Sequence, residues 1–159
     1  MNQTHLHLLI NHLPVFGSIL GSLVLVHGLW TKSNQTKIAA YNVLILSSIG
    51  ALIAYLTGEA AEETVENIQG VAKNMIDAHE DMAVFAFASF IGLGIISIAG
   101  IFFTLRKSPI TRSVAIFTLF VSLISFGLVA KTAYDGGQIR HTEINAAGNT
   151  QQPNQEDGD

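Results

Sequence analysis

Four long apolar blocks alternate with short polar segments along the chain. The blocks cover roughly residues 8–30, 38–57, 82–105 and 113–134. Each is near the ~20 residues that an α-helix needs to cross the hydrocarbon core of a bilayer. Backbone N–H and C=O groups find no water there, so each block is expected to be a helix. The pattern predicts an all-α, integral membrane four-helix bundle with both termini on the same side.

The polar segments set the domain organisation. Residues 1–143 form the predicted transmembrane domain, with a polar connection at 58–81 between the second and third spans. Residues 144–159 are rich in Asn, Gln, Gly and Asp and should form a disordered polar tail. Charged residues make up only 13% of the chain, about half the usual share of a soluble domain, which agrees with a membrane protein.

Basic residues indicate the orientation of the bundle. The two short connections between spans carry five Lys or Arg residues and no acid, namely Lys32, Lys37, Arg106, Lys107 and Arg112. The opposite side carries only Lys73, Lys131 and Arg140. By the positive-inside rule the short connections are cytoplasmic. Both termini and the connection 58–81 are then predicted to be periplasmic, in a bacterial inner membrane.

The composition excludes several kinds of site. A net charge of −4 gives no basic footprint for nucleic acid. The absence of cysteine excludes disulfides, thiolate metal sites, iron–sulfur clusters and c-type haem attachment. All twelve Asp and Glu residues and five of the six histidines fall on the predicted outer side. The kind of functional site that the composition still allows is one built from histidines and carboxylates at one end of the bundle.

Four residues are the main candidates for that chemistry. His12 lies about one turn inside the first span, and His79 tops the inward-facing stripe of the third. Glu59 and Glu62 continue the small-residue face of the second span beyond the membrane. His7, Glu80 and His141 are weaker candidates.

Two kinds of centre fit these residues. Imidazole together with carboxylate suits zinc, iron or copper(II), as in metal sites built on facing helices of a bundle. Alternatively, His12 and His79 could be the axial ligands of a haem b held between helices, because haem needs only one or two axial ligands in an apolar pocket. The sequence leaves the choice between haem b and a divalent metal open.

Several of the polar and small residues also have ordinary explanations. Asp77 and Glu80 have the spacing of a capping box opening the third helix. Lys131 either snorkels to the headgroups or neutralises part of the acidic cluster at Glu59–Glu66. Gly17 and Gly21 form a small-residue ridge that suits either packing within the bundle or a homodimer contact.

One stretch resembles a known family. His7-Leu-Leu-Ile-Asn-His12-Leu-Pro14 resembles the His-Pro-x-x-x-His-Phe-Pro opening of an uncharacterised family of four-helix bacterial membrane proteins. Gly136-Gly137-Gln138-Ile139-Arg140-His141 is similar to a shortened form of that family's closing motif, and the acids make this chain a branch with added carboxylates. Leu8 replaces the proline, and the closing motif lacks its tyrosine and final glycine. The resemblance implies the fold and points to His7, His12, His79 and His141, without a mechanism.

Three functions are consistent with the sequence. The first is a haem- or metal-binding membrane protein in redox or electron transfer. The second is a non-catalytic membrane subunit whose polar face binds a partner protein. The third is a membrane-embedded metal-dependent hydrolase with Glu59 or Glu62 as general base.

Overall fold

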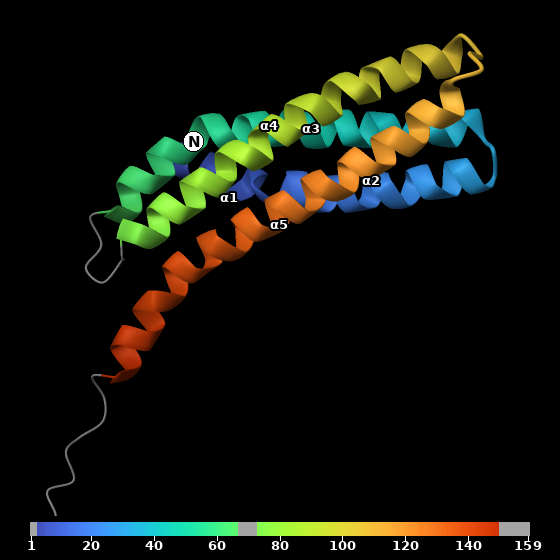
Figure 1. Ribbon diagram of the computed structural model, residues 1–159. Coiled ribbons are helices and arrows are strands. Elements are labelled where there is room, and N and C mark those ends of the chain that lie inside the picture. The colour runs from blue at the N-terminus through green and yellow to red at the C-terminus, as the bar shows by residue number, and fades with distance from the viewer. Residues whose placement is uncertain (1–2, 67–72, 150–159) are drawn as a thin grey trace, which may run out of the picture.

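The protein is a bundle of long helices that run nearly side by side (Figure 1). The computed structural model describes residues 3–66 and 73–149, and it describes their side chains except at 3, 59–66, 74–75 and 138–149. Its helices are α1 (Gln3–Ile10), α2 (His12–Trp30), α3 (Asn34–Glu66), α4 (Lys73–Leu105) and α5 (Thr111–Asn149). Four segments are long and apolar enough to cross a membrane: Thr4–Trp30, Asn34–Gly58, Ile76–Leu105 and Thr111–Gly137. The predicted all-α four-helix membrane bundle is therefore confirmed.

The first span is interrupted at Asn11, where α1 ends and α2 begins. Pro14 explains the position of the break. Its nitrogen has no hydrogen to give to the carbonyl of Ile10, one turn earlier, and its ring would clash with that carbonyl in a continuous helix. The short helix α1 packs mainly against α3 rather than against α2. His7 lies on α1, before this break.

Two helices extend beyond their expected boundaries. α4 begins at Lys73, so Asp77 and Glu80 lie inside the helix and the capping-box interpretation of this pair is wrong. Both side chains are exposed. α5 continues through Asn149, so residues 144–149 are helical although their composition predicts a disordered tail. A helix held by apolar contacts can extend into polar sequence, since adding a residue to an existing helix is easier than starting one.

The four long helices form a ring in which each packs on two neighbours. α2 packs on α3 and α5, and α4 packs on α3 and α5. Small residues let the backbones approach closely. A Cβ added at Gly17 would lie 2.8 Å from Ser47 Cβ, and one added at Gly21 would lie 2.6 Å from Leu44 Cδ2. The Gly17 and Gly21 ridge is thus buried against α3, and it is not free to form the homodimer contact that the sequence left open.

Large apolar side chains cover the outside of the ring, whereas its interior is partly polar. Exposed leucines, isoleucines and phenylalanines occur along all four long helices, as expected for helices that face lipid. Leu25, Leu44, Phe90 and Leu93 fill the interior together with buried serines and threonines. Most of these hydroxyls donate to a carbonyl of their own helix, as Ser22 does to Ser18. The bundle is therefore packed through small polar residues and a few large apolar ones.

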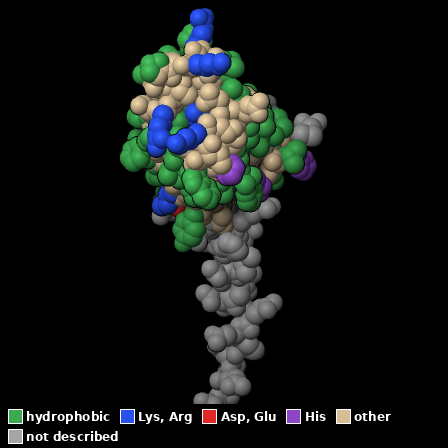
Figure 2. Space-filling view, turned by 90° about the vertical axis from the view of Figure 1, so that its right-hand side faces the viewer, with side chains coloured by type: hydrophobic (Ala, Val, Ile, Leu, Met, Phe, Trp, Pro, Cys, Tyr) green, Lys and Arg blue, Asp and Glu red, His purple; other side chains and the backbone are tan. Residues whose placement is uncertain are grey.

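The two ends of the bundle differ in charge. The basic end, formed by residues 31–33 and 106–110 with the adjacent first turns of α3 and α5, carries the five Lys and Arg residues of the short connections. Figure 2 looks onto this end, and Lys and Arg side chains gather on it. The opposite end, here called the histidine end, carries His7 and His79 at the level of Gly58 and Gly136.

Candidate functional site

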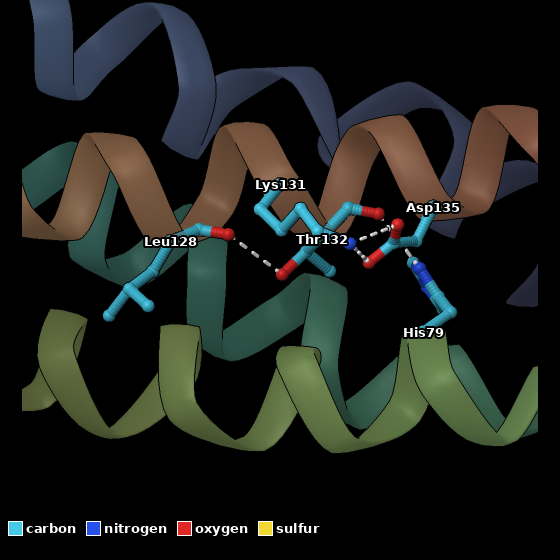
Figure 3. Close-up of polar contacts among 5 residues, drawn as sticks. All are labelled: His79, Leu128, Lys131, Thr132 and Asp135. Carbon is cyan, nitrogen blue, oxygen red and sulfur yellow. Dashed lines mark hydrogen bonds and ion pairs between the residues drawn. The ribbon is translucent and has the colours of Figure 1, made fainter.

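His79 points from α4 toward α5 at the histidine end (Figure 3). Its Nδ1 lies 2.9 Å from the backbone carbonyl oxygen of Thr132. The ring also fits against Gly136, where an added Cβ would lie 3.0 Å from the His79 Cε1. A glycine at this position lets the α5 backbone approach the imidazole closely. The half-buried side chain is therefore held between two helices, as the sequence stripe of α4 predicts.

His7 makes a similar contact from α1 to α3. Its Nδ1 lies 2.9 Å from the backbone carbonyl oxygen of Ala54 and 3.3 Å from the hydroxyl of Thr57. Thr57 donates its own hydroxyl hydrogen to the carbonyl of Ile53 at 2.8 Å, so its oxygen accepts from His7. The side chain is half-buried, and Gly58 lies beside the ring.

These contacts assign the hydrogens of both rings. A backbone carbonyl can only accept, so the Nδ1 of His7 and the Nδ1 of His79 must each carry a hydrogen. In the neutral imidazole the lone pair is then on Nε2. Neither Nε2 makes a hydrogen bond to a residue that the structure describes. Metal-binding histidines have this arrangement, with one ring nitrogen donating to a carbonyl and the other binding the metal.

The two imidazoles lie at the same end of the bundle. They lie on different helices and far apart in the chain. Each is fixed by a backbone carbonyl of a further helix. Four helices, α1, α3, α4 and α5, thus contribute to the positions of two rings. In both rings the Nδ1 hydrogen bond leaves Nε2 as the nitrogen with a lone pair.

The other predicted histidine of the first span lies elsewhere. His12 is exposed at the start of α2, and the contact of its ring is with Phe16 on the same helix, at 6.4 Å between centroids. Glu80 is exposed as well. The structure therefore holds His7 and His79 against a neighbouring helix, whereas His12 is exposed.

Three further predicted ligands cannot be placed in this way. The side chains of Glu59, Glu62 and His141 lie outside the described residues, although their backbones belong to α3 and α5. Among the side chains that the structure does describe, no group of three or more His, Asp or Glu residues is arranged to hold a metal ion. The described part of the site consists of two imidazoles and their anchoring carbonyls.

A charged pair lies on α5 next to the anchor of His79. The ammonium of Lys131 binds the carboxylate of Asp135 one turn further along the helix, with Nζ 2.6 Å from Oδ2 (Figure 3). Asp135 is 12% exposed and Lys131 54%. The sequence left Lys131 either snorkelling or neutralising Glu59–Glu66; its described partner is Asp135. Because the Lys131 side chain is exposed, the pair contributes little to stability.

The prominence of His7 follows from features that the hydropathy pattern does not display. His7 precedes the first apolar block, so its side chain is expected to be peripheral. One signal is Pro14, which accounts for the interruption after Ile10 and so for the short helix that carries His7. A buried threonine followed by glycine, Thr57-Gly58, marks its partner on α3.

Comparison of the chain with models of protein families, with curated proteins and with solved structures gave no match. The fold and the geometry at the histidine end are therefore the grounds on which a function can be assigned.

Proposed function

We propose that this multi-pass membrane protein binds a transition-metal centre, either haem b or a non-haem metal ion, through the Nε2 atoms of His7 and His79, and that the centre serves redox chemistry or electron transfer. One observation carries the proposal. Both rings donate Nδ1–H to a backbone carbonyl at 2.9 Å, which fixes the tautomer whose free nitrogen is a metal ligand.

The tautomer of both rings supports a ligand role, because the nitrogen that does not donate to a carbonyl keeps its lone pair. Neutral imidazole is the form that binds metals. Haem iron takes one or two such ligands. A non-haem ion would need further donors, and Glu59 and Glu62 on the last turns of α3 would supply them with carboxylate oxygens.

The location of the protein belongs to the same proposal. The basic end faces the cytoplasm of a bacterium, since five Lys and Arg residues flank the short connections there. The histidine end then faces the periplasm. A centre at that end would exchange electrons with partners in the periplasm or the outer leaflet.

The test is to purify the full chain in detergent and to measure its absorption spectrum, haem content and metal content. We expect either a haem spectrum that sharpens on reduction or one metal ion per chain in a sample without a haem spectrum. The first outcome identifies haem and the second a non-haem ion.

Variants connect the centre to the residues. His7→Ala and His79→Ala should each lower the bound cofactor at least several-fold, while His27→Ala, an exposed histidine near the basic end, should not. His12→Ala separates the two candidate histidines of the N-terminal region and should behave like His27→Ala. A protein that carries neither haem nor metal after expression with both supplied would refute the proposal. So would a centre that survives His7→Ala together with His79→Ala.

A further inference from the structure

The two short connections of the bundle have the same pattern. Residues 31–37 read Thr-Lys-Ser-Asn-Gln-Thr-Lys, and residues 106–112 read Arg-Lys-Ser-Pro-Ile-Thr-Arg. In both, a lysine with positive φ ends one helix, at 54° for Lys32 and 52° for Lys107. A non-glycine residue rarely adopts this conformation. The shared sequence and the shared backbone conformation together indicate related segments.

The similarity continues into the helices when the chain is aligned on Lys32 and Lys107 without a gap. In the helix after each connection, the matching positions are Ala40 and Ala115, Leu44 and Leu119, Ser47 and Ser122, Ile49 and Ile124, and Thr57 and Thr132. In the helix before it, Gly17 matches Gly92 and Ser22 matches Ser97. Ile49 and Ile124 are exposed; the other matching side chains are buried except Leu119, which packs against the core. Most of the side chains that the two halves share in the helices thus face the interior.

The packing has the symmetry that two copies would produce. The first hairpin consists of α2 and α3, and the second of α4 and α5. The first helix of each hairpin packs on the second helix of the other: α2 packs on α5, and α4 packs on α3. Both hairpins begin at the histidine end and turn at the basic end (Figure 1). The axis that relates them therefore runs along the bundle, as in membrane proteins built from parallel repeats.

The histidine contacts obey the same relation with a small shift. When positions are counted from Lys32 and Lys107, His79 lies three positions further from its connection than His7 does. The acceptor carbonyls shift equally, since Thr132 lies three positions further from its connection than Ala54 does. Such a shift is nearly one helical turn. Each hairpin therefore uses the same contact, in which a histidine before or within its first helix is held by a carbonyl of its second.

We infer that the chain consists of two copies of one helical hairpin and that the proposed centre is a bis-imidazole haem b between the copies, with one axial histidine from each. The inference rests on the proposed function and narrows it. The choice of haem follows from what the copies share. Counted with or without the shift, Glu59 matches Tyr134 or Gly137, and Glu62 matches Gly137 or Arg140. The carboxylates belong to one copy, whereas the imidazoles belong to both.

Two imidazoles that approach from opposite hairpins suit a metal with two open positions on opposite sides. Haem iron has this geometry, because the macrocycle occupies the other four positions. The His7 and His79 rings enter from α1, which precedes the first hairpin, and from α4, which begins the second. Among the described side chains, no group of three or more His, Asp or Glu residues is arranged to hold a smaller ion.

The experiment compares equivalent single variants in the full chain reconstituted with haem b. The wild type should show the spectrum of six-coordinate, low-spin haem in both oxidation states. His7→Gly and His79→Gly should each give five-coordinate, high-spin haem, and added imidazole should restore the low-spin spectrum in both. His7→Met and His79→Met fill the vacated space with another axial ligand, so they test the same point should the glycine variants fold poorly.

The outcomes separate the inference from the function. A low-spin spectrum that persists in one of the two glycine variants would mean that only one histidine binds iron, and the two-copy site would be refuted while the cofactor remained. A non-haem ion in place of haem would refute this inference and leave the proposed function intact. A chain that binds neither would refute both. His12→Gly is the matched control and should remain low-spin.

Discussion

At the scale of single residues, packing inside the bundle depends on where glycines make room for large side chains. The ring of Tyr41 on α3 lies against Gly100 on α4. A Cβ added at Gly100 would lie 2.6 Å from the Tyr41 Cε1 and 2.9 Å from its Cε2. Aromatic carbons cannot approach a methyl group this closely, so the glycine is what allows the tyrosine into the core.

Gly100→Ala should therefore destabilise the protein by about 1–3 kcal/mol through overpacking. Gly92→Ala on the same helix is the control, since nothing lies within 4 Å of its added Cβ. That variant should be neutral or stabilising by up to about 1 kcal/mol, the usual advantage of alanine over glycine in a helix. Thermal unfolding in detergent measures both. Equal stabilities of the two variants would show that Tyr41 can move aside without cost.

The histidine anchors have an energetic consequence that does not depend on any cofactor. Replacing His7 or His79 by phenylalanine removes a hydrogen bond from a part-buried carbonyl while retaining most of the side-chain volume. We expect each variant to lose about 1 kcal/mol of stability in the cofactor-free protein. His12→Phe should change stability by less than about 0.5 kcal/mol, as exposed substitutions usually do. Chemical unfolding in mixed micelles compares the three; a loss confined to His12→Phe would contradict the assigned contacts.

At the scale of elements, a hydrogen bond between serines joins the two hairpins. The Ser22 and Ser122 hydroxyl oxygens lie 2.7 Å apart, between α2 and α5, and both residues are buried. Ser22 donates to the carbonyl of Ser18, and Ser122 donates to the carbonyl of Leu119. Each hydroxyl has only one hydrogen. The serine that donates to the other serine must therefore use the same hydrogen for its carbonyl, and this sharing weakens the bond between the serines.

A double-mutant cycle of Ser22→Ala and Ser122→Ala should give a coupling of about 0.6 kcal/mol, the average for hydrogen bonds between membrane helices. Ser89 serves for the control cycle with Ser22, because its hydroxyl donates to Ala86 on its own helix. That cycle should be additive to within about 0.5 kcal/mol. A coupling of the same size in both cycles would mean that the measured term does not come from the α2–α5 contact.

The elements also show where sequence patterns succeed and fail. The four apolar blocks agree with the four spans because the requirement to satisfy backbone hydrogen bonds in lipid acts on each segment independently. Ends are harder. α4 starts at Lys73, one turn before the apparent capping residue Asp77, because neighbouring helices support turns that local signals do not require.

At the scale of the whole molecule, the distribution of charge predicts the orientation. A reporter that is active only in the cytoplasm should be silent when fused after Asp159 and active when inserted between Ser108 and Pro109, in the connection between α4 and α5. Exchanging Lys32, Lys37, Arg106, Lys107 and Arg112 for glutamine should raise the share of inverted molecules. Cytoplasmic activity of the C-terminal fusion in the unmodified protein would overturn the predicted orientation.

The internal repeat is a whole-molecule property that the sequence contains but its hydropathy does not display. Only a minority of the positions from Ser22 to Gly58 are identical to their partners in the second half, and most of these identical residues are buried. Because every span has similar hydropathy, such a repeat stays hidden in the pattern of apolar blocks. The matching connections stand out in the structure, where Lys32 and Lys107 share an unusual backbone conformation.

The sequence by itself determined the fold class, the four spans and the end of the bundle at which histidines gather. These properties depend only on the order of apolar and polar residues along the chain, which can be assigned one helix at a time. The tertiary structure decided which histidines are held by neighbouring helices. His79 was expected to face inward and contacts Thr132 on α5. In the first span the histidine held by another helix is His7, which contacts Ala54 on α3, whereas His12 is exposed. Which side chains point toward a neighbouring helix depends on the rotation and relative depth of several helices. Close contacts such as that of Gly136 with His79 set these positions.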